Sequence, residues 1–148
     1  MSSHVYHEIY LHFNWHTKND VPLLTGRLEE LAYSALREKC RLTKGVYFHD
    51  IGGTDTHVHV VMDIEPFVTI SDMVGELKGG SSFRVNEQMR HKALEWQRGY
   101  GVVSFGKSHL PWILDYVRHQ REHHSRGTTH ERLEASDQPD DPAVEQAG

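Results

Sequence analysis

The sequence predicts an α+β fold: a ferredoxin-like antiparallel sheet with helices packed on one face, plus a further helix at the C-terminal end. Two observations support this prediction. First, the chain contains segments in which apolar and polar residues alternate, as is typical of half-buried strands, and segments whose apolar residues recur at helical spacing. Their order is strand, helix, strand, strand, helix, strand, helix. A chain of 148 residues has room for one such domain with a sizeable core.

The first half of the chain supplies three strands and one helix. The first strand is expected over residues 6–15, and its core-facing residues are Ile9, Leu11, Phe13 and Trp15. An amphipathic helix follows at 26–41, after the candidate N-cap Thr25. Strands at 46–51 and 57–64 are joined by a glycine-containing turn, which favours a hairpin.

The second half supplies two helices around one short strand. Thr69, with Asp72 three residues later, resembles a capping box and starts a helix. That helix should end near Gly79-Gly80, because glycine commonly follows the last helical turn. A strand at 101–105 and a final helix over 108–124 complete the predicted domain.

Charge divides the chain into a domain at 1–132 and an acidic tail at 133–148. The formal net charge is −5, and the tail carries five acidic side chains and no Lys or Arg. The remaining 132 residues therefore hold 16 basic and 16 acidic side chains, since five of the 21 acidic residues lie in the tail. The proline-punctuated tail is expected to be disordered. A neutral body lacks the overall positive charge that is usual in DNA-binding proteins.

We expect no secretory signal, because the start of the sequence has no apolar stretch. We expect no membrane span either, because no apolar run approaches the roughly 18 residues that a span needs. Cys40 is the single cysteine, so one chain can form no internal disulfide. A reducing cytoplasm is the expected location.

His57-Val58-His59 is the sharpest chemical signal. Residues two apart on a strand point the same way, so both imidazoles should project from one face about 7 Å apart. Two neutral imidazoles on a rigid surface suit a divalent cation, although the same pattern also occurs on solvated strand faces.

Tyr116 and Gln120 lie four apart on the last predicted helix and hence on one face of it. Tyr116 borders the apolar stripe of Ile113, Leu114 and Val117, so it is either a tyrosine packed at the edge of the core or a nucleophile. Taken alone, Gln120 is a surface amide.

A third group combines small and basic residues that could bind phosphate: backbone N–H groups approach closely where side chains are small, and the basic residues flank them. The group is Lys78, Gly79, Gly80, Ser81, Ser82 and Arg84. A glycine pair at this point is also a simple helix stop.

The last helix also carries His119, His123 and His124, of which His119 and His123 share a face. Together with His57 and His59 they could form an all-histidine zinc site. Alternatively, they are solvated residues near a helix C-terminus, where the helix dipole favours their charged form.

Five stretches are informative in combination: FNWHTK at 13–18, THVHVV at 56–61, LKGGSS at 77–82, YGVVSF at 100–105 and YVRHQ at 116–120. In order and setting they resemble the single-tyrosine transposases of the insertion-sequence 200/605 type, which belong to the HUH class. The resemblance covers roughly residues 5–125.

The resemblance implies a ferredoxin-like fold and a homodimer. It implies that His57, His59 and Gln120 bind Mg²⁺ or Mn²⁺ and that Tyr116 is the nucleophile. The implied substrate is single-stranded DNA with hairpins at element ends, cleaved through a 5′-phosphotyrosine. One departure is His119, where such proteins often carry Asn.

Two other functions remain open at this point. A non-catalytic, single-stranded nucleic-acid-binding module could stack bases on exposed Tyr10, His12 and Tyr47. A related possibility is a domesticated transposase that binds DNA hairpins but no longer transposes. A histidine-ligated zinc hydrolase would need a carboxylate base, for which Asp55 or Glu122 are candidates.

Overall fold

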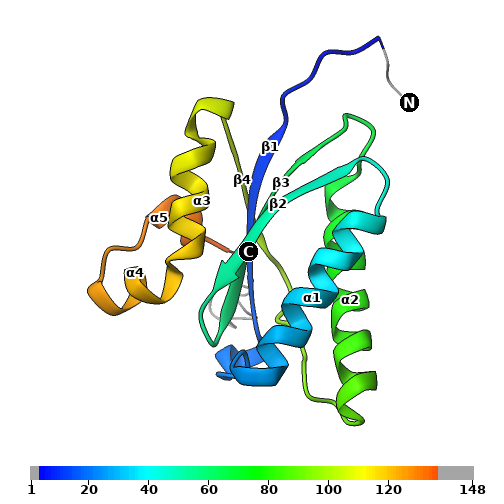
Figure 1. The fold of residues 1–148 in the computed structure, drawn as a ribbon, viewed down its shortest axis with the longest axis vertical. Helices are drawn as coiled ribbons and strands as arrows, with labels where there is room; N and C mark the ends of the chain where they lie inside the picture. The colour runs from blue at the N-terminus through cyan, green and yellow to red at the C-terminus, as the bar shows by residue number, and fades with distance from the viewer. Residues whose placement is uncertain (1–3, 137–148) are drawn as a thin grey trace, which may run out of the picture.

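A computed structural model describes residues 4–136. Its centre is a four-stranded sheet in the order β2-β3-β1-β4 (Figure 1). The strands are β1 (Tyr10–His16), β2 (Val46–Gly53), β3 (His57–Ile64) and β4 (Gly101–Phe105). All neighbouring strands pair antiparallel, which confirms the predicted sheet. The first strand begins later than expected, at Tyr10.

One face of the sheet packs against α1 (Gly26–Leu42) and α2 (Ile70–Met89). The core between them is built from the predicted apolar faces, including Phe13 and Trp15 of β1 and Val58 and Val60 of β3, all fully buried. Burial of these side chains is the main stabilising contribution to the domain, at about 1.5–3 kcal/mol for each large apolar residue.

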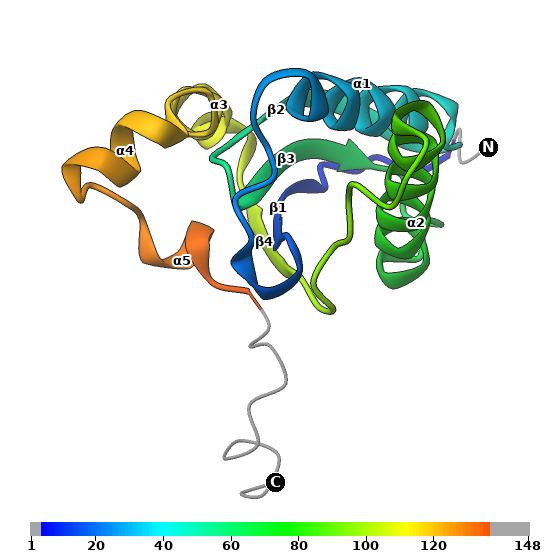
Figure 2. The ribbon, with the colours of Figure 1, turned by 90° about the horizontal axis from the view of Figure 1, so that it is seen from below.

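The opposite face of the sheet is covered by the C-terminal helices α3 (Leu110–Arg118), α4 (Gln120–Arg126) and α5 (Glu131–Glu134). Figure 2 shows the strands between α2 on one side and this group on the other. A second, smaller core forms there from Val61, Ile113, Tyr116, Val117 and Leu133. The sheet is therefore buried on both faces near β1 and β3.

The predicted end of α2 at Gly79-Gly80 is wrong, because the helix continues to Met89 and ends at Arg90 in the left-handed conformation. Each mid-helix glycine costs about 1 kcal/mol relative to alanine. Burial of Ser81 and Val85 beyond the glycine pair outweighs that local preference. Thr69, the predicted cap, makes no side-chain capping hydrogen bond.

The predicted final helix over 108–124 is interrupted. A short 3-10 helix, η2 (Lys107–His109), precedes α3, and His119 separates α3 from α4 with φ −113° and ψ 33°. A second 3-10 helix, η1 (Lys18–Asp20), follows β1. The break at His119 ends α3 and gives α4 a direction of its own (Figure 2).

Residues 133–136 were expected to belong to a disordered tail, and the structure corrects this. Leu133 and Glu134 form the end of α5, and Leu133 is only 2% exposed. The rest of the expected tail, 137–148, lies outside the described residues. Across residues 4–136, no helix has both the length and the apolar character that a membrane crossing requires.

Candidate metal centre and nucleophile

His57 and His59 lie on β3 and face the second core, while Val58 and Val60 face the first. Both histidines are buried, at 3% and 0% exposure, and their ring centroids are 5.0 Å apart. This confirms the shared face that the strand alternation predicted, but the face is covered by helices instead of being solvated.

The Nδ1 atoms of both histidines are held by neighbouring side chains. His57 Nδ1 lies 3.0 Å from Thr54 Oγ1 and 3.1 Å from Thr56 Oγ1. His59 Nδ1 lies 2.7 Å from His12 Nε2. Fixing one ring nitrogen in this way orients the other, which is how metal-binding histidines are commonly supported.

The Nε2 atoms of His57 and His59 are buried without a hydrogen-bond partner among the described residues. Buried polar atoms are nearly always satisfied, so two orphaned nitrogens side by side need an explanation. Burial lowers the pKa of His59 to about 4, so its imidazole is neutral near pH 7 and carries a lone pair for a cation.

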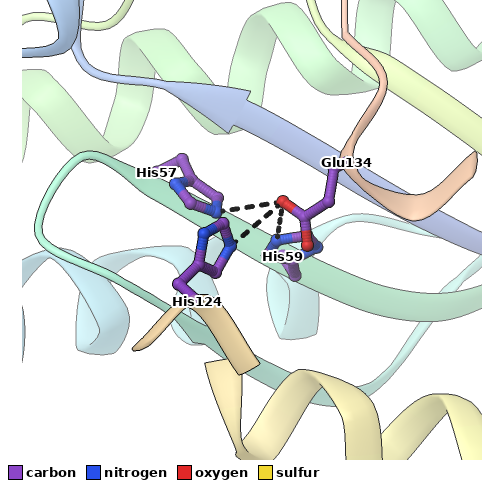
Figure 3. Close-up of side chains that lie close together, drawn as sticks. All are labelled: His57, His59, His124 and Glu134. Atoms are coloured by element: carbon purple, nitrogen blue, oxygen red, sulfur yellow. Dashed lines mark ion pairs between the residues drawn. The ribbon is translucent and has the colours of Figure 1, made fainter. Parts of the chain in front are cut away.

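His124 from α4 and Glu134 from α5 converge on the same point. Figure 3 shows one carboxylate oxygen of Glu134 facing all three imidazoles. This Oε1 atom lies 3.3 Å from His57 Nε2, 3.4 Å from His59 Nε2 and 3.3 Å from His124 Nε2. One ligand atom from each of the four residues can be chosen so that all lie within 4.8 Å of one another.

This arrangement fits a divalent cation. Imidazole nitrogen and carboxylate oxygen are donors that Mn²⁺, Zn²⁺ and related ions accept. Burial opposes ionisation of Glu134, but its contacts with His57 and His59 outweigh burial and hold its pKa well below the usual range. The carboxylate is therefore charged at neutral pH and available to a metal.

Tyr116 lies directly beside this cluster. Its ring centroid is 6.1 Å from that of His59, and its ring stacks on Trp112 at 5.7 Å with an interplanar angle of 11°. The hydroxyl donates a hydrogen bond to Glu134 Oε2 and accepts one from the His130 backbone N–H at 2.8 Å. Burial and the contact with Glu134 raise the pKa of Tyr116 to about 12.

Gln120 is buried (1% exposed) at the start of α4 and reaches the edge of the cluster. Its Nε2 donates to the Tyr116 carbonyl oxygen at 3.3 Å, and its Oε1 lies 3.1 Å from His124 Nε2. The structure thus brings together, within one chain, the two histidines, the tyrosine and the glutamine that the sequence singled out.

The group Lys78, Gly79, Gly80, Ser81, Ser82 and Arg84 does not join this site. It lies within α2, on the other side of the sheet, where the helix occupies its backbone N–H groups. Lys78 Nζ donates to the carbonyl oxygens of Gln97 at 2.6 Å and Gly99 at 2.8 Å, and Ser81 is buried. The expected backbone phosphate cradle is therefore wrong, while DNA contact through exposed Arg84 stays a prediction.

The other histidines of the last helices differ in position relative to the site. His119 is exposed and pairs with Asp115, and His123 packs on the Tyr116 ring at 4.7 Å. Only His124 reaches the His57–His59 pair.

The base-stacking face proposed for a binding module also differs from the expectation at one residue. His12, expected to be exposed, is fully buried under the C-terminal helices, against His59.

Sequence reasoning missed Glu134 and the supporting contacts of Thr54, Thr56 and His12. No feature of the neighbouring sequence distinguishes Glu134 from the acidic residues that follow it. The sequence does contain a signal for His12. Alternation along β1 places His12 on the same strand face as Asn14, and Asn14 pairs with His59 in the sheet.

Comparison with known proteins identifies the family. Residues 5–120 match the family described as "Transposase IS200 like". The chain is 34% identical over 108 residues to the transposase for insertion sequence element IS200 of Salmonella typhimurium, covering 69% of this chain and 70% of that protein. The corresponding protein of Salmonella typhi matches equally well.

Two solved structures share the fold. A putative transposase from Deinococcus radiodurans superposes with a TM-score of 0.63 at 20% identity, over 79% of this chain and 95% of that one. A REP-associated tyrosine transposase bound to a REP hairpin gives a TM-score of 0.59 at 13% identity, over 87% and 76% respectively. On the family match and the sequence identity together, this chain belongs to the IS200-like transposases.

Proposed function

We propose that this protein is a transposase that cleaves and rejoins single-stranded DNA at hairpin-bearing element ends, with Tyr116 as the nucleophile. Membership of the IS200-like family supports the reaction class. The observation that carries the proposal is the phenol of Tyr116 beside two buried imidazoles whose Nε2 atoms lack hydrogen bonds among residues 4–136.

His57 and His59 hold the cation in this proposal, and Gln120 is the third ligand implied by the family resemblance. Bound Mg²⁺ or Mn²⁺ would polarise the scissile phosphate and stabilise charge on its non-bridging oxygens. Thr54 and Thr56 fix the His57 ring through Nδ1, and His12 fixes the His59 ring. The imidazoles are thus oriented before the cation and the substrate arrive.

Tyr116 attacks phosphorus in line with the departing 3′ oxygen. A bond forms between the phenol oxygen and phosphorus, the bond from phosphorus to the 3′ oxygen breaks, and the phenol proton is lost as the free 3′-OH gains one. The 5′-phosphotyrosine keeps the energy of the phosphodiester, so rejoining to another 3′-OH needs no ATP. The hydrogen bond from Tyr116 to Glu134 has to open before the phenol oxygen can approach phosphorus.

A pocket beside Tyr116 suits a nucleotide of single-stranded DNA. It has a volume of about 530 Å³, and its lining includes Trp112, His130 and Arg132. Aromatic rings and a guanidinium are the groups on which unpaired bases stack. A solved relative is bound to a REP hairpin, which supports hairpin DNA as the substrate class.

The homodimer implied by the family resemblance is part of the proposal. Because Tyr116 and the histidine pair come together within one chain, cleavage in this proposal uses each subunit's own tyrosine. Sedimentation of the full chain, with and without hairpin DNA, measures the assembly state.

The test uses a labelled single strand with a hairpin end and Mg²⁺ or Mn²⁺. Wild-type protein should form a covalent protein–DNA adduct, Tyr116→Phe should form none, and Tyr47→Phe, an exposed tyrosine on β2, should behave as wild type. An adduct retained by Tyr116→Phe would remove the nucleophile from its role. Undiminished cleavage by a His57→Ala, His59→Ala double variant would end the metal proposal.

A zinc hydrolase is a second candidate, favoured by the three imidazoles and one carboxylate at the centre. Glu122, one of the two carboxylates considered as the catalytic base of such a hydrolase, forms an ion pair with Arg126 at 2.9 Å. Metal analysis separates the two functions: stoichiometric, tightly held zinc supports the hydrolase, and readily exchanged Mg²⁺ or Mn²⁺ supports the transposase.

A further inference from the structure

We propose that His124 and Glu134 are ligands of the metal centre in addition to His57, His59 and Gln120, so that the C-terminal segment adds a third imidazole and a carboxylate to the site. This inference rests on the proposed function for the position of the cation at His57 and His59. It goes beyond the family match, which ends at residue 120, before both added ligands.

The spacing of the donor atoms supports a shared cation. Glu134 Oε1 lies 3.3–3.4 Å from the Nε2 atoms of all three histidines. Charge-assisted hydrogen bonds would be shorter, at about 2.7–2.9 Å. Donor atoms that share one cation at about 2.0–2.2 Å in a tetrahedral site lie about 3.3–3.6 Å apart. The three distances from Glu134 Oε1 therefore match the spacing of donor atoms around an ion, and all four donors lie within 4.8 Å of one another.

The unsatisfied nitrogens of His57 and His59 also point at Glu134 (Figure 3). Among the described residues, the buried Nε2 atoms of His57 and His59 have no hydrogen bond, although both lie next to the same oxygen. A cation between them would satisfy the two nitrogens and the carboxylate at once. His124 is partly exposed, so it closes the cluster on the solvent side.

The backbone around Glu134 is held in place by the rest of the fold. Asn14 Nδ2 donates to the carbonyl oxygens of Leu133 at 3.1 Å and Ala135 at 2.8 Å, on either side of Glu134. Gly101 of β4 leaves room for this segment, because a Cβ there would collide with the Ala135 carbonyl oxygen. Leu133 is buried in the second core. Three independent contacts thus fix the backbone around the carboxylate.

This ligand set selects the type of ion. Imidazole nitrogens suit transition metals such as Mn²⁺ and Zn²⁺, whereas Mg²⁺ prefers oxygen donors and retained water. The centre should therefore bind Mn²⁺ more tightly than Mg²⁺. The Tyr116 hydroxyl bonds the other oxygen of Glu134, so the same carboxylate joins the ion to the nucleophile.

The test measures Mn²⁺ binding to the full chain by calorimetry, together with the imidazole nitrogens detected on bound Mn²⁺ by pulsed electron paramagnetic resonance. Glu134→Gln should weaken Mn²⁺ binding by at least about tenfold. His124→Ala should also weaken it and should lower the number of bound imidazoles from three to two. Circular dichroism checks that each variant is folded.

Matched controls are Glu131→Gln, on the same short helix, and His119→Ala, whose ring pairs with Asp115 outside the cluster. Both should bind Mn²⁺ as wild type does. Gly101→Ala keeps every ligand but displaces the segment, and it should weaken binding as Glu134→Gln does.

The outcomes separate this inference from the proposed function. If His57→Ala abolishes Mn²⁺ binding while Glu134→Gln leaves it unchanged or tightens it, Glu134 is not a ligand and the inference is overturned. If wild-type protein binds no Mn²⁺, the metal part of both proposals fails. If the metal binds as expected but no DNA adduct forms, only the transposase reaction fails.

Discussion

Tyr116 donates its hydroxyl hydrogen bond to Glu134, a residue 18 positions later in the chain. Burial of the phenol, together with its ionised partner carboxylate, raises the pKa of Tyr116 to about 12, so the phenol is protonated at neutral pH. In this arrangement the tyrosine is held and not yet activated. In the proposed reaction, activation of Tyr116 has to come from the arrival of the cation and the DNA phosphate, which would change the surroundings of both groups.

Substituting Gly52 should displace the helix that carries the tyrosine. Gly52 pairs with His59 in the sheet, and a Cβ at this position would collide with the backbone carbonyl oxygen of Val117. Gly52→Ala should therefore push α3 away, destabilise the fold by about 1–3 kcal/mol and lower single-turnover DNA cleavage by about 100-fold. Urea unfolding and a cleavage time course measure the two effects.

Gly75→Ala is the control for that substitution. Gly75 lies in α2 with no heavy atom near a built Cβ, so alanine should stabilise the protein by about 0.5–1 kcal/mol and leave cleavage unchanged. Equal behaviour of the two variants would show that contact between β2 and α3 does not position the tyrosine.

Truncating Leu133 should loosen α5 without unfolding the sheet. Leu133 is 2% exposed and packs with Ile113 and Tyr116 in the second core. Leu133→Ala should lower the local free energy of opening by about 2 kcal/mol, because α5 has few other apolar contacts. Hydrogen exchange should rise over residues 128–136 and stay unchanged in β1 and β3, whereas Leu42→Ala, at an exposed site, should change neither.

Stability should fall as pH falls from about 6.5 to about 4. Burial lowers the pKa of His12 to about 3 and that of His59 to about 4, while both are near 6.5 in the unfolded chain. Between these values the unfolded state binds more protons, so acid favours unfolding. The charged and titratable groups facing the pair are Glu134, His57, His124 and His130.

Urea unfolding in chelator at pH 7, 6 and 5 tests this expectation. The free energy of unfolding should drop by on the order of 2–4 kcal/mol from pH 7 to pH 5. His12→Asn should reduce the drop, and His91→Gln, at an exposed site, should leave it as it is. A stability that is constant across this range would show that the pair titrates normally in the folded protein.

Mixing two inactive variants tests whether each site uses its own tyrosine. Tyr116→Phe lacks the proposed nucleophile and His57→Ala lacks a proposed metal ligand. Because Tyr116 packs against the histidine pair of its own chain, a mixture of the two should form no DNA adduct. Adduct formation in the mixture would show that a tyrosine from one subunit reaches the histidines of another.

Several elements could be predicted from the sequence because their signals are local. Strand β3 occupies the residues expected, since its apolar alternation and the preceding glycines act within a few residues. The end of α2 was missed because glycine propensity is also local, whereas the burial of Val85 depends on the rest of the fold.

Half of the candidate site could likewise be predicted from the sequence. The His57–His59 pair and the tyrosine with its glutamine follow regular spacing, so their shared faces could be expected. The position of Glu134 depends on Asn14, whose side chain bonds the Ala135 carbonyl oxygen 121 residues away in sequence. No periodicity links residues so far apart, and only the folded chain brings them together.

Mapping the covalent adduct tests the central claim most directly. Wild-type protein is incubated with Mn²⁺ and a hairpin-ended single strand, digested with trypsin and nuclease, and analysed by mass spectrometry. The account predicts a nucleotide joined through its 5′ phosphate to Tyr116, within the peptide that spans residues 108–118. A nucleotide attached to any other residue, or DNA cleaved with no protein adduct at all, would contradict it.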